Sequence, residues 1–91
     1  MDPGFRFERF ADSASALAAF NAAYPPGSPI QPALQALVDI GAQCKAVSQT
    51  RVACRYVEKS GLVTWSWQLA LECDAERAIR RAVMSLAAVG P

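Results

Sequence analysis

The 91-residue sequence contains no histidine. Histidine is the most frequent general base in enzymes, the usual partner of a nucleophilic serine or cysteine, and the most frequent metal ligand. Its absence excludes Ser-His and Cys-His catalytic pairs, so an enzyme would have to work through tyrosine, cysteine or carboxylate groups. We therefore expect a protein that is not an enzyme and that holds no cofactor or metal.

Paired cysteines and glycine-rich loops are missing as well. The five glycines are scattered, so no phosphate-binding loop is formed. The three cysteines, Cys44, Cys54 and Cys73, lack the paired spacing of a zinc site. We expect all three to be reduced, small apolar side chains in a cytoplasmic protein. The alternative is a disulfide that joins Cys44 to Cys73 or to Cys54.

Long apolar runs and an excess of one charge are also absent. No stretch approaches the roughly 18 apolar residues of a membrane span, and the N-terminus lacks the pattern of a signal peptide. Residues 1–4 are either a native start or a disordered or vector-derived remnant. The net charge is +1 and the isoelectric point is about 7.7, whereas nucleic-acid-binding domains usually exceed about 9. A protein partner is therefore favoured over nucleic acid or a membrane.

The length and composition indicate a single folded domain over residues 1–91. Hydrophobic residues make up 53% of the chain, which suffices for a core without covalent cross-links. The pattern predicts an α+β fold, in which an antiparallel sheet of three to four strands has one face covered by two to three helices.

The strongest pattern runs from Arg51 to Cys73 and predicts a β-hairpin. From Val63 onward, apolar and polar residues alternate strictly, as in a half-buried antiparallel strand. Ser60-Gly61 fits a two-residue turn, since glycine tolerates a positive φ. The apolar faces of the two strands then coincide, with Tyr56 opposite Trp65, Cys54 opposite Trp67 and Val52 opposite Leu69.

Helices are predicted on either side of a proline cluster. Asp12 or Ser13 begins the first, which runs to about Tyr24 before Pro25-Pro26 stops it. The second begins at Ser28 or Ile30 and ends at Gly41. We expect short strands over residues 5–8 and 43–49, the latter with Cys44, Ala46 and Val47 turned inward and a turn near Gln49-Thr50.

The segment after the hairpin is predicted to be a last helix, which Asp74 begins and which ends near Ala88. Ile79, Ala82, Val83 and Leu86 recur at helical spacing. From Ile30 to Ala88, the order helix, three strands, helix resembles a double-stranded-RNA-binding domain. That family opens its last helix with a Ser-Lys-Lys phosphate clamp. The matching residues here, Asp74, Ala75 and Glu76, include two acids that would repel phosphate, so the resemblance assigns no site residue.

Two further groups have a structural and a functional interpretation. Glu72, Asp74 and Glu76 could bind a hard cation or act as an acid-base pair, but their position favours capping of a helix N-terminus. Trp65 and Trp67 could line a ligand pocket, but their strand spacing beside Leu69 and Leu71 favours the core.

The arginines are the candidate binding residues. Alternation places Arg51, Arg55 and Lys59 on the outer sheet face, beside Gln68, and this face is either solvated or a recognition surface. A second group, Arg77, Arg80 and Arg81, is predicted on the last helix. Because that helix would cover the tryptophan face, the two basic groups would lie on opposite sides of the molecule.

These patterns predict a protein-protein interaction module that binds through the open face or an edge of its sheet. An adaptor, an assembly factor and a small inhibitor, of the kind found on mobile genetic elements, all fit. A homodimer is the simplest form of self-association for such a sheet. The alternative is a small nucleic-acid-binding regulator that uses the exposed arginines.

Overall fold

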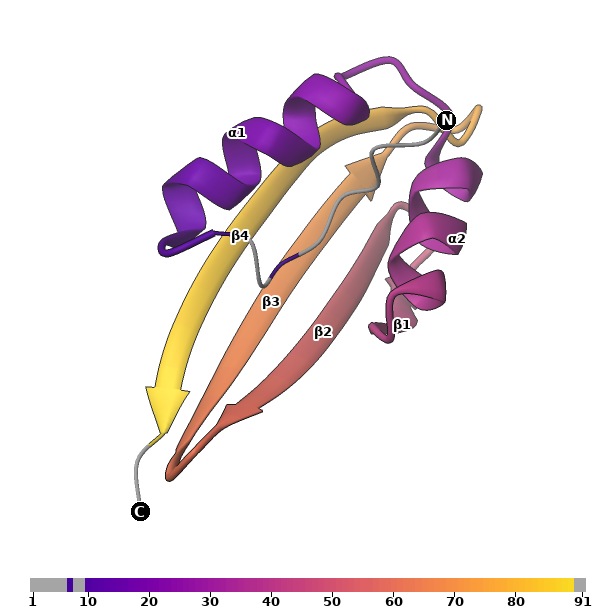
Figure 1. Cartoon of the computed structure of the whole chain (residues 1–91). Helices are drawn as coiled ribbons and strands as arrows, with labels where there is room; N and C mark the ends of the chain where they lie inside the picture. Colours follow the sequence, from indigo (N-terminus) through magenta and orange to yellow (C-terminus); the bar gives the residue numbers. More distant parts are fainter. Residues whose placement is uncertain (1–6, 8–9, 90–91) are drawn as a thin grey trace.

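The computed structural model of the chain describes residues 7 and 10–89, which form two helices and a four-stranded antiparallel sheet (Figure 1). The helices are α1 (Ser13–Ala23) and α2 (Ile30–Asp39). The strands, β1 (Gln43–Ser48), β2 (Arg51–Ser60), β3 (Val63–Cys73) and β4 (Ile79–Val89), lie side by side in chain order. The predicted α+β class is confirmed.

Both helices pack on one face of the sheet, with α1 over β4 and α2 beside β1 (Figure 1). The core between these layers contains Phe20, Ile30, Leu37, Leu69 and Leu71, all essentially inaccessible to water. The strand predicted over residues 5–8 lies outside the described residues except for Phe7. That ring is buried as expected, and it stacks on Tyr56 with 5.1 Å between centroids and lies 5.5 Å from Trp67.

The two helices begin and end as the sequence predicts. The Asp12 carboxylate accepts a hydrogen bond of 2.7 Å from the Ser15 amide and so caps α1. This amide, followed by the Ser15 hydroxyl, holds the pKa of Asp12 below its ordinary value. At the end of α2, Gly41 takes a φ of 101°, the left-handed conformation that glycine adopts at low cost.

The β2–β3 hairpin confirms the predicted faces but not the predicted register. Tyr56 lies opposite Trp67 rather than Trp65, because the turn is Gly61-Leu62 and Ser60 pairs with Val63. Gly61 has a φ of 62°, which suits the first position of a two-residue turn that needs only one positive φ. Moving the turn by one residue slips the pairing by two, and this slip leaves every side chain on its original face.

The same slip places Cys54 opposite Leu69 instead of Trp67, and Val52 opposite Leu71 instead of Leu69. The β1 prediction is confirmed as Gln43–Ser48, with the turn at Gln49-Thr50. Of the three residues predicted to turn inward, only Cys44 is half-buried: Ala46 is exposed although it shares the face of Val52, and Val47 is exposed.

The last predicted helix is wrong, because Ile79–Val89 forms strand β4 instead. From Arg81 onward the segment alternates, with Ala82, Met84 and Leu86 turned to the core and Val83 and Ser85 turned outward. A register irregularity between Glu72 and Cys73 sets Ile79 out of phase with this alternation. Since the segment ends in a strand, the order of elements does not match a double-stranded-RNA-binding domain.

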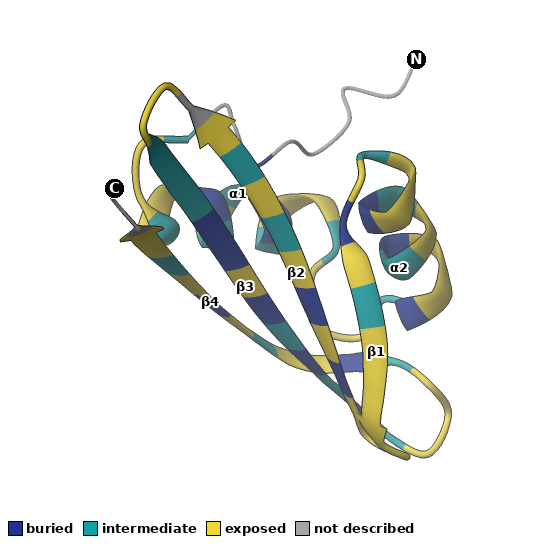
Figure 2. Ribbon diagram, turned by 90° about the horizontal axis from the view of Figure 1, so that it is seen from below, coloured by how far each residue is buried: buried dark blue, intermediate teal, exposed yellow. Residues whose placement is uncertain are grey.

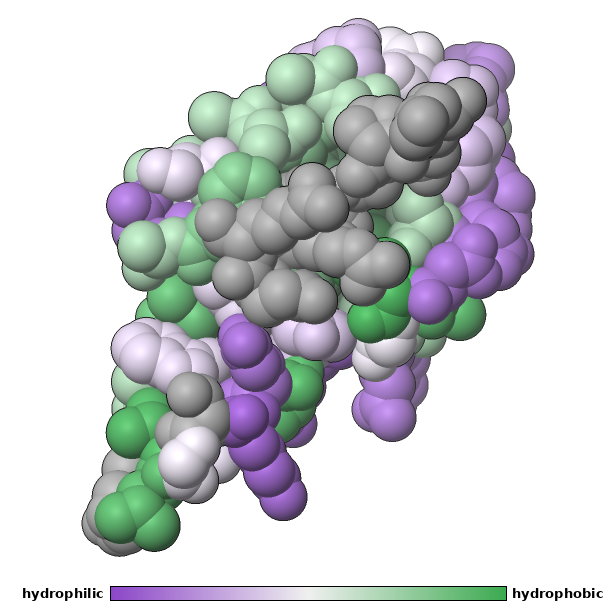
Figure 3. All heavy atoms as spheres, in the orientation of Figure 1, coloured by the Kyte–Doolittle hydropathy of each residue, from purple (hydrophilic) through white to green (hydrophobic). Residues whose placement is uncertain are grey.

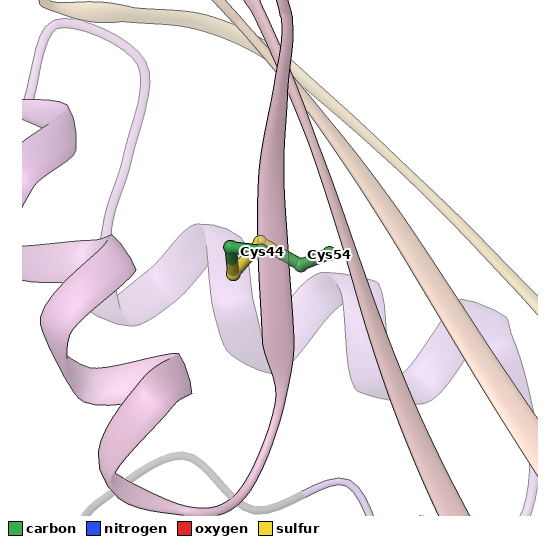
Figure 4. Close-up of a disulfide and its surroundings, with 2 residues drawn as sticks. All are labelled: Cys44 and Cys54. Atoms are coloured by element: carbon green, nitrogen blue, oxygen red, sulfur yellow. A yellow bond between two sulfur atoms is a disulfide. The ribbon is translucent and has the colours of Figure 1, made fainter.

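The prediction of three reduced cysteines is also wrong. Cys44 on β1 and Cys54 on β2 are directly opposite each other and form a disulfide, with 4.0 Å between their Cα atoms (Figure 4). The bond joins the edge strand β1 to its neighbour β2. Cys73 is a free, buried thiol, as predicted.

Candidate binding surface

The face of the sheet that no helix covers is the candidate binding surface, and we call it the open face. In Figure 2 the sheet is seen in front of α1 and with α2 beside β1, and exposed positions alternate with buried or half-buried ones along β2. The side chains that the strand registers assign to the open face are Gln43, Lys45 and Ser48 of β1, Arg51, Ala53, Arg55, Val57 and Lys59 of β2, Thr64, Ser66, Gln68, Ala70 and Glu72 of β3, and Arg81, Val83, Ser85 and Ala87 of β4.

Charge is distributed unevenly between the two sides of the molecule. Among the described residues, the open face carries five basic side chains, Lys45, Arg51, Arg55, Lys59 and Arg81, and one acidic side chain, Glu72. Helices α1 and α2 contain no lysine or arginine, and α2 ends in Asp39. The chain's net charge of +1 therefore averages over a basic sheet face and, on the other side of the sheet, two helices that carry no lysine or arginine.

The structure brings parts of the two predicted basic groups together. Arg51 is opposite Glu72 on β3, and Glu72 is in turn opposite Arg81 on β4. The two arginines thus flank one carboxylate in a single row across the open face. Their predicted separation on opposite sides of the molecule is wrong, because it depended on the helix that β4 replaces.

At this end of the sheet the row borders an open polar cleft of about 710 Å³. Arg80, which is exposed, also lines this cleft, together with Ser48 and Thr50. Arg77 is exposed in the β3–β4 loop with a φ of 65° and is not among the residues that line the cleft.

Arg55 and Gln68 form the next row of the open face. They are opposite each other on β2 and β3, and Ser85 follows on β4. Arg55 Nε donates a hydrogen bond of 3.4 Å to Ser66 Oγ, and Ser66 is only 6% exposed although it belongs to the open face. The guanidinium is therefore held along the sheet instead of extending freely into water.

The centre of the open face is apolar and slightly hollow. Ala53, Ala70 and Val83 lie side by side on three strands, and the small side chains leave a depression of about 310 Å³. Arg55, Gln68 and Ser85 border it on one side. A small apolar centre with a polar, charged rim is the usual composition of a protein-protein interface.

The predicted carboxylate cluster has a structural role. Asp74 Oδ1 accepts hydrogen bonds from the backbone amides of Glu76, at 3.0 Å, and Ala78, at 2.9 Å. It therefore caps the β3–β4 loop rather than a helix. In the described part of the chain, no group of three or more histidine, cysteine, aspartate or glutamate side chains could hold a metal ion.

The tryptophans lie on the helical side, as predicted. Trp67 is buried, while Trp65 is half-buried and lines a hollow of about 250 Å³ with Phe10, Glu58 and Leu86. Within residues 7 and 10–89, neither helix has the length and apolarity needed to cross a membrane. Comparisons with family models, curated proteins and solved structures find no match to this chain.

Sequence reasoning missed Lys45 and the apolar centre of the open face. Lys45 is a single lysine on a short strand, and its position beside Ala53 follows only from the register of β1 to β2. Val83 was assigned to a helix stripe. The alternation of Ala82, Met84 and Leu86 was the signal that could have placed Val83 on the open face.

Proposed function

We propose that this chain is a non-enzymatic interaction module that binds an acidic protein partner on the open face of its sheet. The observation that carries the proposal is the set of five cations on the open face, on the side of the sheet opposite the helices, with Arg55 at the border of the apolar depression. Complementary charge orients and accelerates association, and the arginines supply several donors to carboxylates. An adaptor, an assembly factor and a small inhibitor all remain compatible with such a surface.

The composition of the open face favours a protein over single-stranded nucleic acid. Proteins that bind single strands stack bases on aromatic side chains. Tyr56, Trp65 and Trp67 all point to the helical side, and the described part of the open face has no aromatic residue. Glu72, between Arg51 and Arg81, would also repel a phosphate placed on that row.

Crosslinking from the open face tests this proposal. A photoreactive residue at Ala53 should crosslink an acidic protein from the native cell extract, and the same residue at Ala22, exposed on α1, should not. The product should be degraded by protease and unaffected by nuclease. Crosslinking of the same protein from both positions, or from Ala22 alone, would contradict the proposal. A product of twice the chain's mass would report self-association instead.

Nucleic-acid binding is the second candidate function, supported by the convergence of Arg51, Arg80 and Arg81 on one cleft. With about three phosphate contacts, the logarithm of the binding constant should fall with that of the salt concentration with a slope of about −3. We expect weak binding that is lost at physiological salt. Fluorescence anisotropy with single- and double-stranded oligonucleotides measures this. Tight binding at physiological salt would place this function first.

A further inference from the structure

The free edge of the sheet is strand β4. It is the last strand of the sheet, so one row of its backbone groups has no neighbouring strand. The start of this edge is already covered, since the Ile79 carbonyl accepts from the Gly27 amide and the Ile79 amide donates to the Ser28 carbonyl, both at 2.7 Å. No other loop or helix in the described part of the chain makes a backbone hydrogen bond to β4. As far as residues 7 and 10–89 are concerned, the edge is therefore open from Arg80 to Val89.

The opposite edge of the sheet is protected. Strand β1 has six residues against eleven in β4, and it carries Lys45 and an irregular register between Ala46 and Ser48. Its disulfide to β2 further restrains it. Short length, lysine and bulges are the devices by which proteins prevent edge-to-edge pairing. Strand β1 has all three of these protective features, whereas most of β4 has none of them.

The sequence of the open part of β4 favours pairing with another strand. Residues 82–89, Ala-Val-Met-Ser-Leu-Ala-Ala-Val, contain no charge, no proline and no glycine. Apolar side chains lie at the surface near the β2–β3 turn and the end of β4 (Figure 3), where Leu62 is 77% exposed. A long, uncharged, unprotected edge strand is a template for another strand.

We propose that the occupant of this edge is a second copy of the chain, paired antiparallel through β4 about a two-fold axis at Ser85. Ile79 is covered, and Arg80 has no partner in the β3–β4 register, so the regular part of the open edge runs from Arg81 to Val89. Its full antiparallel self-overlap centres on Ser85. This register places Met84 opposite the second copy's Leu86, and Val83 opposite its Ala87. Arg81 falls opposite Val89, so no like charges face each other.

The symmetry of this pairing extends the open face. An antiparallel pair related by a two-fold axis perpendicular to the sheet keeps the helices of both copies on the same side. The two sheets then become one continuous sheet with a single uncovered face. Each row of basic side chains on one copy is repeated on the other. This inference depends on the β4 edge alone and stands whether or not the open face binds an acidic protein.

Sedimentation equilibrium from micromolar to millimolar concentration tests the dimer, with the intramolecular disulfide intact. Wild type should dimerise reversibly. Ser85→Lys places two lysines at the two-fold axis and should raise the dimer dissociation constant at least about tenfold. Ala53→Lys is the matched control: Ala53 is also exposed on the open face but lies on the central strand β2, so this change should leave that constant unchanged.

A second variant and a second measurement exclude a folding defect. Ala87→Lys should raise the dimer dissociation constant as Ser85→Lys does. In wild type, protection of the β4 amides from hydrogen exchange should rise with protein concentration, and in the two lysine variants it should not. A monomer at all concentrations would overturn the inference. So would a dimer that resists both lysine variants, or one that Ala53→Lys weakens equally. Protection of β4 only when another protein is added would assign the edge to that protein and would also overturn it.

Discussion

Trp67→Ala is expected to lower the free energy of unfolding by about 3–5 kcal/mol, because it removes a large ring from a packed core. Trp67 is 2% exposed and contacts the buried ring of Phe7. A small domain has only about 5–15 kcal/mol of stability, so the variant should be close to unfolded at room temperature. Urea and thermal denaturation measure the loss.

Two controls separate packing from chemistry at this position. Trp67→Phe keeps an aromatic ring and removes the indole N–H, which has no hydrogen-bond partner among the described residues, so it should cost less than Trp67→Ala. Arg55→Ala, on the opposite face, should change stability by no more than about 0.5 kcal/mol, since Ser66 then gains water in place of its donor. A Trp67→Ala variant as stable as wild type would contradict the assignment of sheet faces.

Loss of the Cys44–Cys54 disulfide is expected to cost about 3 kcal/mol, because the bond restricts the unfolded chain over a separation of ten residues. The double variant Cys44→Ala/Cys54→Ala should be less stable than oxidised wild type by this amount, and reductant should not affect its stability. Cys73→Ala, which leaves the bond intact, should keep the sensitivity of wild type to reductant.

Thiol titration checks the pairing itself. In denaturant without reductant, one thiol per chain should react, that of Cys73, and three would contradict the disulfide. The same titration on protein taken directly from cells tests the predicted cytoplasmic location. Disulfides persist in oxidising compartments, so a cytoplasmic protein should contain the Cys44–Cys54 pair largely reduced.

The faces of the hairpin were predictable and its register was not, for one reason. Strand alternation has a period of two, so a slip of two residues changes the partner of Tyr56 from Trp65 to Trp67 without moving either side chain to the other face. The turn decides between these registers, and both Ser60-Gly61 and Gly61-Leu62 offer a glycine that accepts a positive φ.

The sequence did not predict strand β4 because the helix propensity of its residues opposes the strand that they form. Ala82, Ala87 and Ala88 favour a helix, while Val83 and Ala87 put apolar groups on the outer face and hide the alternation. The gain from pairing with β3 is non-local and outweighs that preference. The disulfide, by contrast, had a visible signal, since Cys44 and Cys54 are equally distant from Gln49, at the predicted turn.

The affinity of the crosslinked partner for arginine variants tests the open face most directly. We expect Arg51→Ala and Arg55→Ala each to weaken binding by more than about fivefold, or about 1 kcal/mol, with little change in stability. Arg77→Ala removes the same charge from the β3–β4 loop and should bind as wild type does. Wild-type affinity in both open-face variants, or an equal loss in Arg77→Ala, would contradict the open face as the binding surface.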